Sequence, residues 1–298
     1  MKILYYDCFC GISGDMNLAA LIDIGVPEEY LIKELSKLNL NSEYEIKVER
    51  AAKLGITGTR VDVILKDESK DESKDEAYIS EQALHEHSHE HYHHNGDEHH
   101  HEDRNHTHED DHSHSHEEHA HNHEHHHRNL KDIEEIINSS DLSNKVKELS
   151  LKMFMKVAEA EAKIHGKALY EVHFHEVGAI DSIVDMVGAA ICLDYLNVDK
   201  IIASPVQVGG GFVKCAHGLM PVPAPATTEI LKNIPINTGI VQFETTTPTG
   251  AAILSANVEE FTPKVNFSII QVAYGIGHRD LEIPDVLRVY LGDKESVE

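Results

Sequence analysis

Two imidazoles and three carboxylates lie between residues 173 and 185, close enough in sequence for metal or proton chemistry. Residues 169–175 are predicted to form a strand on which both histidines point to one face, and a helix is expected from about residue 181, with two aspartates one turn apart. If the strand ends where the helix begins, these groups can bind a metal or accept a proton. For each residue alone, capping or an ordinary polar contact is the simpler interpretation, but the group together predicts a catalytic cluster. The cluster consists of His173, His175, Glu176, Asp181 and Asp185.

A second set of candidates lies in loops that could hold an anionic ligand such as a nucleotide. Backbone N–H groups at the helix start after Ser13 can hold an anion, whereas Asp15 favours a cation or a hydroxyl there. The triple glycine at 209–211 lets a ligand approach the backbone, and Arg279 could fork onto a phosphate or carboxylate. For the turn before Asp15, a tight turn capped by Ser13 is an equally good interpretation, and each of the other loops alone is a weak signal. The candidate substrate-binding residues are Ser13, Gly14, Asp15, Gly210, Gly211, His217, Thr246, Thr247, Thr249 and Arg279.

The histidine-rich segment, residues 85–127, contains twenty of the 25 histidines of the chain. Many of them alternate with other residues, and neutral imidazole is a good ligand for Ni, Cu, Zn and Co ions. This composition predicts binding of transition metals without selecting one of them; the alternative is a solvated, pH-sensitive spacer. The candidate metal ligands are His85, His87, His89, His91, His112, His114, His116, His121, His123, His125, His126 and His127.

The elements that must position these residues lie on both sides of an acidic stretch. Residues 67–76 repeat a four-residue unit without apolar content, so we expect a disordered insertion over 67–128 within a core formed by 1–66 and 129–298. Alternating or buried patterns predict strands at 3–6, 44–48, 61–65, 169–175, 201–208, 265–269 and 286–291. Amphipathic or buried patterns predict helices from 16, then at 27–38, 130–138, 143–165, 181–196, 226–232 and 249–256. Mixed order of this kind favours an α/β or α+β domain.

The net charge of −26 excludes several classes of partner. Nucleic acids and anionic membrane surfaces attract Lys and Arg, and residues 66–127 alone hold nineteen acidic side chains against four basic ones. No run of about 18 uncharged apolar residues is present, so no membrane span is expected. The chain starts without a signal-peptide pattern, and four cysteines in a chain of this size indicate reduced thiols. We therefore expect a cytoplasmic location.

Four blocks of this sequence, in this order, resemble the LarC family of nickel-insertion proteins. The blocks are 7–16 (Asp-Cys-Phe-Cys-Gly-Ile-Ser-Gly-Asp-Met), 173–185, 209–227 and 246–250 (Thr-Thr-Pro-Thr-Gly), and a long histidine-rich insertion near the middle is also usual in that family. The resemblance implies insertion of Ni(II) into pyridinium-3,5-bisthiocarboxylate mononucleotide, forming Ni–S bonds and a Ni–C bond at ring carbon C4. It also implies a dependence on CTP with a divalent metal.

The resemblance has further implications for partners. Longer relatives carry a C-terminal domain with which CTP binding is associated, so we interpret this chain as the N-terminal portion, with activity that depends on a separately supplied C-terminal portion. A nickel-pincer-dependent enzyme would receive the finished cofactor. The alternative function is a non-catalytic, histidine-rich protein that stores or carries nickel or zinc.

Overall fold

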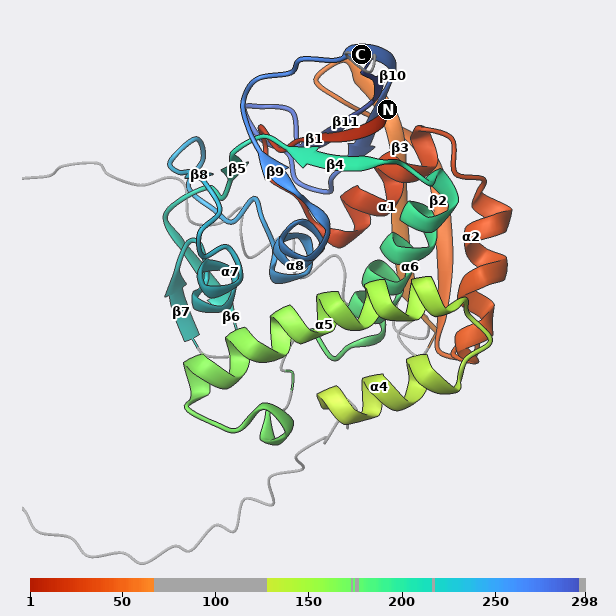
Figure 1. Ribbon diagram of the computed structural model, residues 1–298. Helices are drawn as coiled ribbons and strands as arrows, with labels where there is room; N and C mark the ends of the chain where they lie inside the picture. Colours follow the sequence, from red (N-terminus) through yellow and green to blue (C-terminus); the bar gives the residue numbers. More distant parts are fainter. Residues whose placement is uncertain (67–127, 173, 175–176, 216–217, 295–298) are drawn as a thin grey trace, which may run out of the picture. The chain divides into compact units, whose positions relative to one another are not determined.

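A seven-stranded mixed sheet, in the order β2-β3-β10-β11-β1-β4-β9, forms the frame of the protein (Figure 1). This computed structural model describes residues 1–66, 128–172, 174, 177–215 and 218–294. The strands of the sheet are β1 (Lys2–Asp7), β2 (Tyr44–Lys53), β3 (Ile56–Leu65), β4 (Lys200–Ala203), β9 (Glu260–Phe261), β10 (Ser268–Ile276) and β11 (Val286–Asp293). β1 runs parallel to β4 and antiparallel to β11. Two small two-stranded sheets pair β5 (Val206–Gln207) with β8 (Ile236–Asn237) and β6 (Phe212–Cys215) with β7 (Gly218–Pro221).

Helices pack on one face of this sheet, where the main hydrophobic core lies. They are α1 (Gly14–Asp23), α2 (Glu28–Leu35), α4 (Leu130–Ser139), α5 (Asn144–His165), α6 (Ile180–Leu196), α7 (Pro225–Ile230) and α8 (Pro248–Asn257), with short 3-10 turns at Ser36–Leu38 and Leu169–Glu171. Because side chains alternate along a strand, Leu4 and Tyr6 of β1 face these helices. Ile3 and Tyr5 face the other side, where they form a much smaller cluster.

The coarse fold prediction is confirmed: the chain forms a mixed α/β structure around a large mixed sheet. The strand predicted at 169–175 is wrong, because Leu169–Glu171 forms a 3-10 turn instead. Val172 and Phe174 are both 1% exposed. Because these two buried residues are two positions apart, the segment has the alternating pattern of a strand without forming one. The strand predicted over 201–208 is divided into β4 and β5 around Pro205, whose ring removes a backbone donor.

The two described residues that flank the segment 67–127 both contact Glu43. The backbone N–H of Lys66 donates to the carbonyl oxygen of Glu43 at 3.0 Å, and the guanidinium of Arg128 binds the Glu43 carboxylate at 2.9 Å. The two flanks of residues 67–127 therefore meet at the start of β2. None of the helices that the structure describes combines the length and apolar character needed to cross a membrane.

Candidate functional site

Three loops meet at the carboxyl ends of the parallel strands β1 and β4. These are residues 8–13, 204–211 and 243–247. The backbone N–H of Ile12 donates to the carbonyl of Thr245 at 3.0 Å, and that of Thr247 donates to the carbonyl of Ile12 at 3.1 Å. Gly209 pairs with Glu244 in a further bridge. Ligands bind at this edge in open α/β sheets, so the loops form the candidate site.

Gly11 permits this close junction. Its φ angle is +84°, and a Cβ atom there would lie 1.9 Å from the carbonyl oxygen of Thr245. Any other residue at position 11 would therefore have a strained backbone and a side chain that clashes with the Thr245 carbonyl. The tight turn brings the start of α1 next to the start of α8, and the N–H-rich ends of both helices lie at the candidate site.

The predicted threonines hold these loops together. The hydroxyl of Thr246 is fully buried and donates to the carbonyl of Gln207 at 2.6 Å. The hydroxyl of Thr247 accepts from the backbone N–H of Gly250 at 3.2 Å and caps α8. Thr249 is 7% exposed. In this structure, then, the hydroxyls of Thr246 and Thr247 have partners within the protein, and contact with a substrate stays a prediction.

Two aspartates from different helices approach each other at the start of α1. A Cβ atom on Gly14 would lie 2.1 Å from Oδ2 of Asp185, so α1 and α6 touch at this glycine. Oδ1 of Asp185 is shielded from solvent and has no hydrogen-bond partner among the described residues. Burial, with the charges of Asp15 and Asp181, raises the pKa of Asp185 well above its usual value. Asp185 therefore favours its protonated form more than an ordinary aspartate does.

Asp15 has the opposite electrostatic environment. Burial alone would raise its pKa, but hydrogen bonds with His278 and Ser13 outweigh burial and lower it. Nε2 of His278 lies 3.1 Å from Oδ2 of Asp15 and 3.3 Å from Oδ1 of Asp62 on β3. Nδ1 of His278 faces the guanidinium of Arg60. One site thus holds one carboxyl that favours the ionised form and one that favours the protonated form, the arrangement used for acid–base work.

The sequence patterns do not predict His278 and Asp62 as residues of the site. Asp62 lies within an alternating strand, where a polar residue normally faces solvent. His278 adjoins Arg279, which was singled out instead. The hydrogen bond to Asp15 raises the pKa of His278, although burial opposes this shift.

Arg279 lies at the edge of the same site. Its backbone N–H donates to the carboxylate of Asp285 at 2.9 Å, and its guanidinium lies 5.4 Å from the centre of the Phe243 ring. Because the side chain is exposed, it is open to an anion. Gly210 and Gly211 lie in the neighbouring loop, and a Cβ atom on Gly211 would come 2.9 Å from the carbonyl of Gln242.

Several predicted residues lie outside the described part of the chain. They are His173, His175, Glu176 and His217, together with all twelve candidate metal ligands of the histidine-rich segment. Asp181 is described: it is exposed, and its Oδ1 accepts from the backbone N–H of Ser182 at 2.7 Å. Within residues 1–66 and the described part after 127, no three His, Cys, Asp or Glu side chains form a group that could hold a metal ion.

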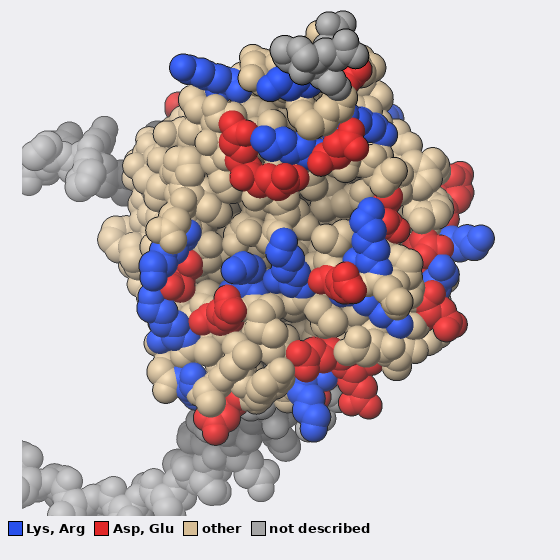
Figure 2. Space-filling view, in the orientation of Figure 1, with Lys and Arg blue, Asp and Glu red and all other residues tan. Residues whose placement is uncertain are grey.

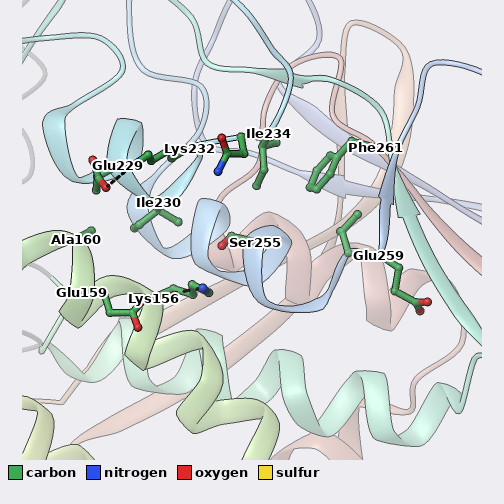
Figure 3. A pocket seen from close by; sticks show the side chains of 12 residues that line it. Lys156, Glu159, Ala160, Glu229, Ile230, Lys232, Ile234, Ser255, Glu259 and Phe261 are labelled. Atoms are coloured by element: carbon green, nitrogen blue, oxygen red, sulfur yellow. Dashed lines mark ion pairs between the residues drawn. The ribbon is translucent and has the colours of Figure 1, made fainter.

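A separate cavity of about 400 Å³ lies between α5, α7, α8 and β9 (Figure 3). Lys156 and Glu159 from α5 lie across it from Glu229 and Lys232, and Ile230 contributes an apolar side chain to its lining. None of the residues predicted for the site lines this cavity. Figure 2 shows acidic and basic side chains intermingled over the visible face, without a broad basic surface.

Comparison with known proteins identifies relatives of the whole chain. It is 73% identical over 296 residues to the pyridinium-3,5-bisthiocarboxylic acid mononucleotide nickel insertion protein of Clostridium acetobutylicum, a match that covers 99% of this chain and 65% of that protein. A protein of the same name from Clostridium kluyveri is 68% identical, with coverage of 100% and 64%. A putative nickel insertion protein from Maridesulfovibrio salexigens is 56% identical, with coverage of 99% and 64%. No solved structure matches the chain.

The chain thus spans somewhat less than two thirds of the length of these relatives. The model of the family described as nickel insertion protein matches residues 4–298, which include every loop of the candidate site. This chain belongs to the nickel insertion protein family.

Proposed function

We propose that this protein inserts Ni(II) into pyridinium-3,5-bisthiocarboxylic acid mononucleotide. The relatives that carry this name match nearly all of the chain at 68–73% identity. The structural observation that supports the proposal is the shielded Oδ1 atom of Asp185, which has no hydrogen-bond partner among the described residues and lies at the start of α1 near Asp15, whose pKa is lowered. In this reaction Ni(II) and the mononucleotide are both substrates.

The chemistry requires a proton acceptor. When nickel bonds to ring carbon C4, the C4–H bond breaks, its electron pair forms the Ni–C bond, and the proton must go to a base. Asp185 suits this role because its raised pKa makes its ionised form a stronger base than an ordinary aspartate. Approach of a dication would favour that ionised form by offsetting the charges of Asp15 and Asp181. His173, His175 and Glu176 remain candidates for the same cluster, from residues outside the described structure.

The mononucleotide requires an anion site. The start of α1 with Ser13 and Gly14, the start of α8 with Thr247, and the exposed guanidinium of Arg279 surround the three loops. Helix N-termini and arginine both stabilise phosphate. We assign the phosphate of the substrate to the two helix N-termini and Arg279. We assign the reacting ring to the region of Asp185.

The histidine-rich segment is proposed as the nickel reserve. The flanks of residues 67–127, which include this segment, meet at Glu43, and a Cβ atom on Gly178, just before α6, would lie 2.8 Å from the backbone carbonyl oxygen of Arg128. The described residue that follows the segment, Arg128, therefore lies beside the start of the helix that carries Asp181 and Asp185. We propose that the insertion expected over residues 67–128 is disordered up to its last residue, Arg128, which binds Glu43, and that it concentrates the metal near the site.

Three finer features belong to the proposal as well. These are a requirement for CTP with a divalent metal, a separately supplied C-terminal portion, and a nickel-pincer-dependent enzyme that receives the product. The second candidate function, a histidine-rich store for nickel or zinc, is favoured by the segment's composition alone.

A reconstituted reaction with a deletion of residues 67–128 separates the two functions. The full chain and the deletion variant are each mixed with the mononucleotide, excess Ni(II), CTP and Mg²⁺, with and without the remaining portion of the Clostridium acetobutylicum relative. Mass spectrometry detects the nickel-containing product. We expect the deletion variant to retain insertion at excess nickel and to lose it at limiting nickel. If the variant binds no mononucleotide and forms no product under any condition, the storage function replaces the proposed one.

A further inference from the structure

The first half of β10 exposes apolar side chains that the described structure leaves uncovered. Ile269 is 49% exposed, Ile270 66% and Val272 42%, and Val265 just before the strand is 41% exposed. We call these four residues the β10 patch. Isolated exposed aliphatic residues are common, but three of them within residues 269–272 of one strand, with a fourth just before the strand, favour an interaction surface.

The arrangement of the sheet explains why the patch is open. β10 pairs with β11 along its whole length, but its pairing with β3 is recorded only at Gly275 with Thr59, near the far end of the strand. A register shift between Ile269 and Gln271 displaces Ile270 from the ladder. Val272 lies opposite Tyr290, on the face that the helices do not cover. Val272 therefore faces away from the main core, and Ile269, which lies opposite Gly292, is on the same face.

Both ends of the described chain lie at the same end of the sheet as the patch (Figure 1). Asp293 pairs with Ser268, the first residue of β10. The ammonium group of Met1 binds the Asp293 carboxylate at 2.9 Å, and the backbone N–H of Lys294 donates to the carbonyl of Met1 at 3.0 Å. A polypeptide joined at either end would begin close to the β10 patch.

The candidate partner for the β10 patch is the part of the relatives that lies outside the matched segment. The match to the Clostridium acetobutylicum protein is one segment of 296 residues that makes up 65% of it, so about a third of that protein lies outside the segment. A region of that size is long enough to form a domain of its own.

We propose that the β10 patch is the docking surface for the portion that these relatives carry outside the matched segment. The occupant presents an apolar surface to Ile269, Ile270 and Val272 and completes the cover of the open sheet face. Burial of three aliphatic side chains drives the contact, and the opposite end of the sheet stays free for the candidate site. This inference is independent of the chemistry at Asp185.

The test measures by calorimetry how that portion, purified from the Clostridium acetobutylicum protein, binds to the whole 298-residue chain. The Ile269→Lys/Ile270→Lys double variant places two charges in the contact and should weaken binding about tenfold or more. Ile32→Lys is the matched control, because Ile32 on α2 is 41% exposed and far from β10 in sequence. It should leave binding within about twofold, since an exposed residue outside an interface contributes little.

Two further measurements decide the outcome. Hydrogen exchange should show slower exchange of the backbone amides of Ser268–Val272 when the portion is added, and unchanged exchange in α2. Absence of binding by the unmodified chain, or equal binding by the double variant, overturns the proposal. Sedimentation of the chain alone tests whether a second copy of the chain covers the patch instead. A dimer that dissociates in the double variant would make the patch a self-association surface and would also overturn the proposal.

Discussion

The two ends of the seven-stranded sheet have opposite characters. At the carboxyl end of β1, buried backbone and hydroxyl groups bond between loops, and two aspartates with opposed pKa shifts meet at Gly14. At the other end, the start of β10 exposes aliphatic side chains beside the chain termini. Polar groups at the first end are costly to bury and persist because the fold satisfies most of them. We infer that one end serves chemistry and the other serves assembly.

The largest expected effect is on the reaction itself, from Asp185→Asn. This change keeps the size of the side chain but removes the base, so the rate of nickel insertion should fall by about a hundredfold or more. The rate is measured at saturating Ni(II) and mononucleotide, with mononucleotide binding followed separately by calorimetry.

Asp194→Asn provides the matched control for that substitution. Asp194 lies on the same helix and pairs with Lys145 at 2.9 Å, away from the loops. It should retain most of the activity. Comparable rates for both variants would remove Asp185 from the mechanism and leave Asp181 as the described member of the cluster.

The junction of the loops can be broken at Gly11. Gly11→Ala forces a Cβ atom to 1.9 Å from the Thr245 carbonyl at a φ of +84°, and we expect a loss of about 3 kcal/mol in the free energy of unfolding. Gly55→Ala is the control, because Gly55 has a φ of +85° with nothing within 4 Å. It should cost only about 1 kcal/mol, the strain of the backbone alone. If urea unfolding shows equal losses of free energy for both variants, the contact between Gly11 and Thr245 does not contribute to stability.

Much of the framework follows from local patterns in the sequence. The predicted helices at 143–165 and 181–196 correspond to α5 and α6, and the four-residue spacing correctly places Asp181 and Asp185 on one helix. Local spacing does not show that Asp181 is exposed whereas the Oδ1 atom of Asp185 is shielded. That difference arises from α1, which packs against α6 at Gly14.

The site contacts that the sequence did not predict join distant parts of the chain. His278 reaches Asp15 and Asp62 only because β10 lies between β3 and β11 in the sheet. Sheet order depends on long-range pairing, which periodicity does not encode. The predicted strand at 169–175 failed for a related reason, since burial of Val172 and Phe174 in a helical core produces the same alternation.

A smaller effect is expected from Thr246→Val. The substitution keeps the shape and removes a buried hydroxyl that donates to Gln207 at 2.6 Å, so the free energy of unfolding should fall by about 1 kcal/mol. If the hydroxyl only joins the loops, the affinity for the mononucleotide should remain unchanged. A large loss of affinity without a loss of stability would instead place Thr246 in contact with the substrate.

The smallest effect should come from His278→Gln. The pKa of His278 is raised above its usual 6.5 by Asp15, so its contribution to stability is fully present below pH 6.5 and is lost as the pH rises through the folded-state pKa. Asp15 and Asp62 favour the charged imidazole and Arg60 opposes it. Because the side chain is 44% exposed, solvent screening keeps the effect below about 1 kcal/mol.

Thermal unfolding of the unmodified chain and of His278→Gln, between pH 5.5 and 8.5, measures this contribution. The melting temperatures should differ most at the acid side and converge as the pH rises. A difference that grows toward alkaline pH would reverse the sign and show that Arg60, rather than Asp15, governs the imidazole. In that case His278 would be held neutral by the guanidinium, and the low pKa of Asp15 would have to depend on Ser13 and the start of α1.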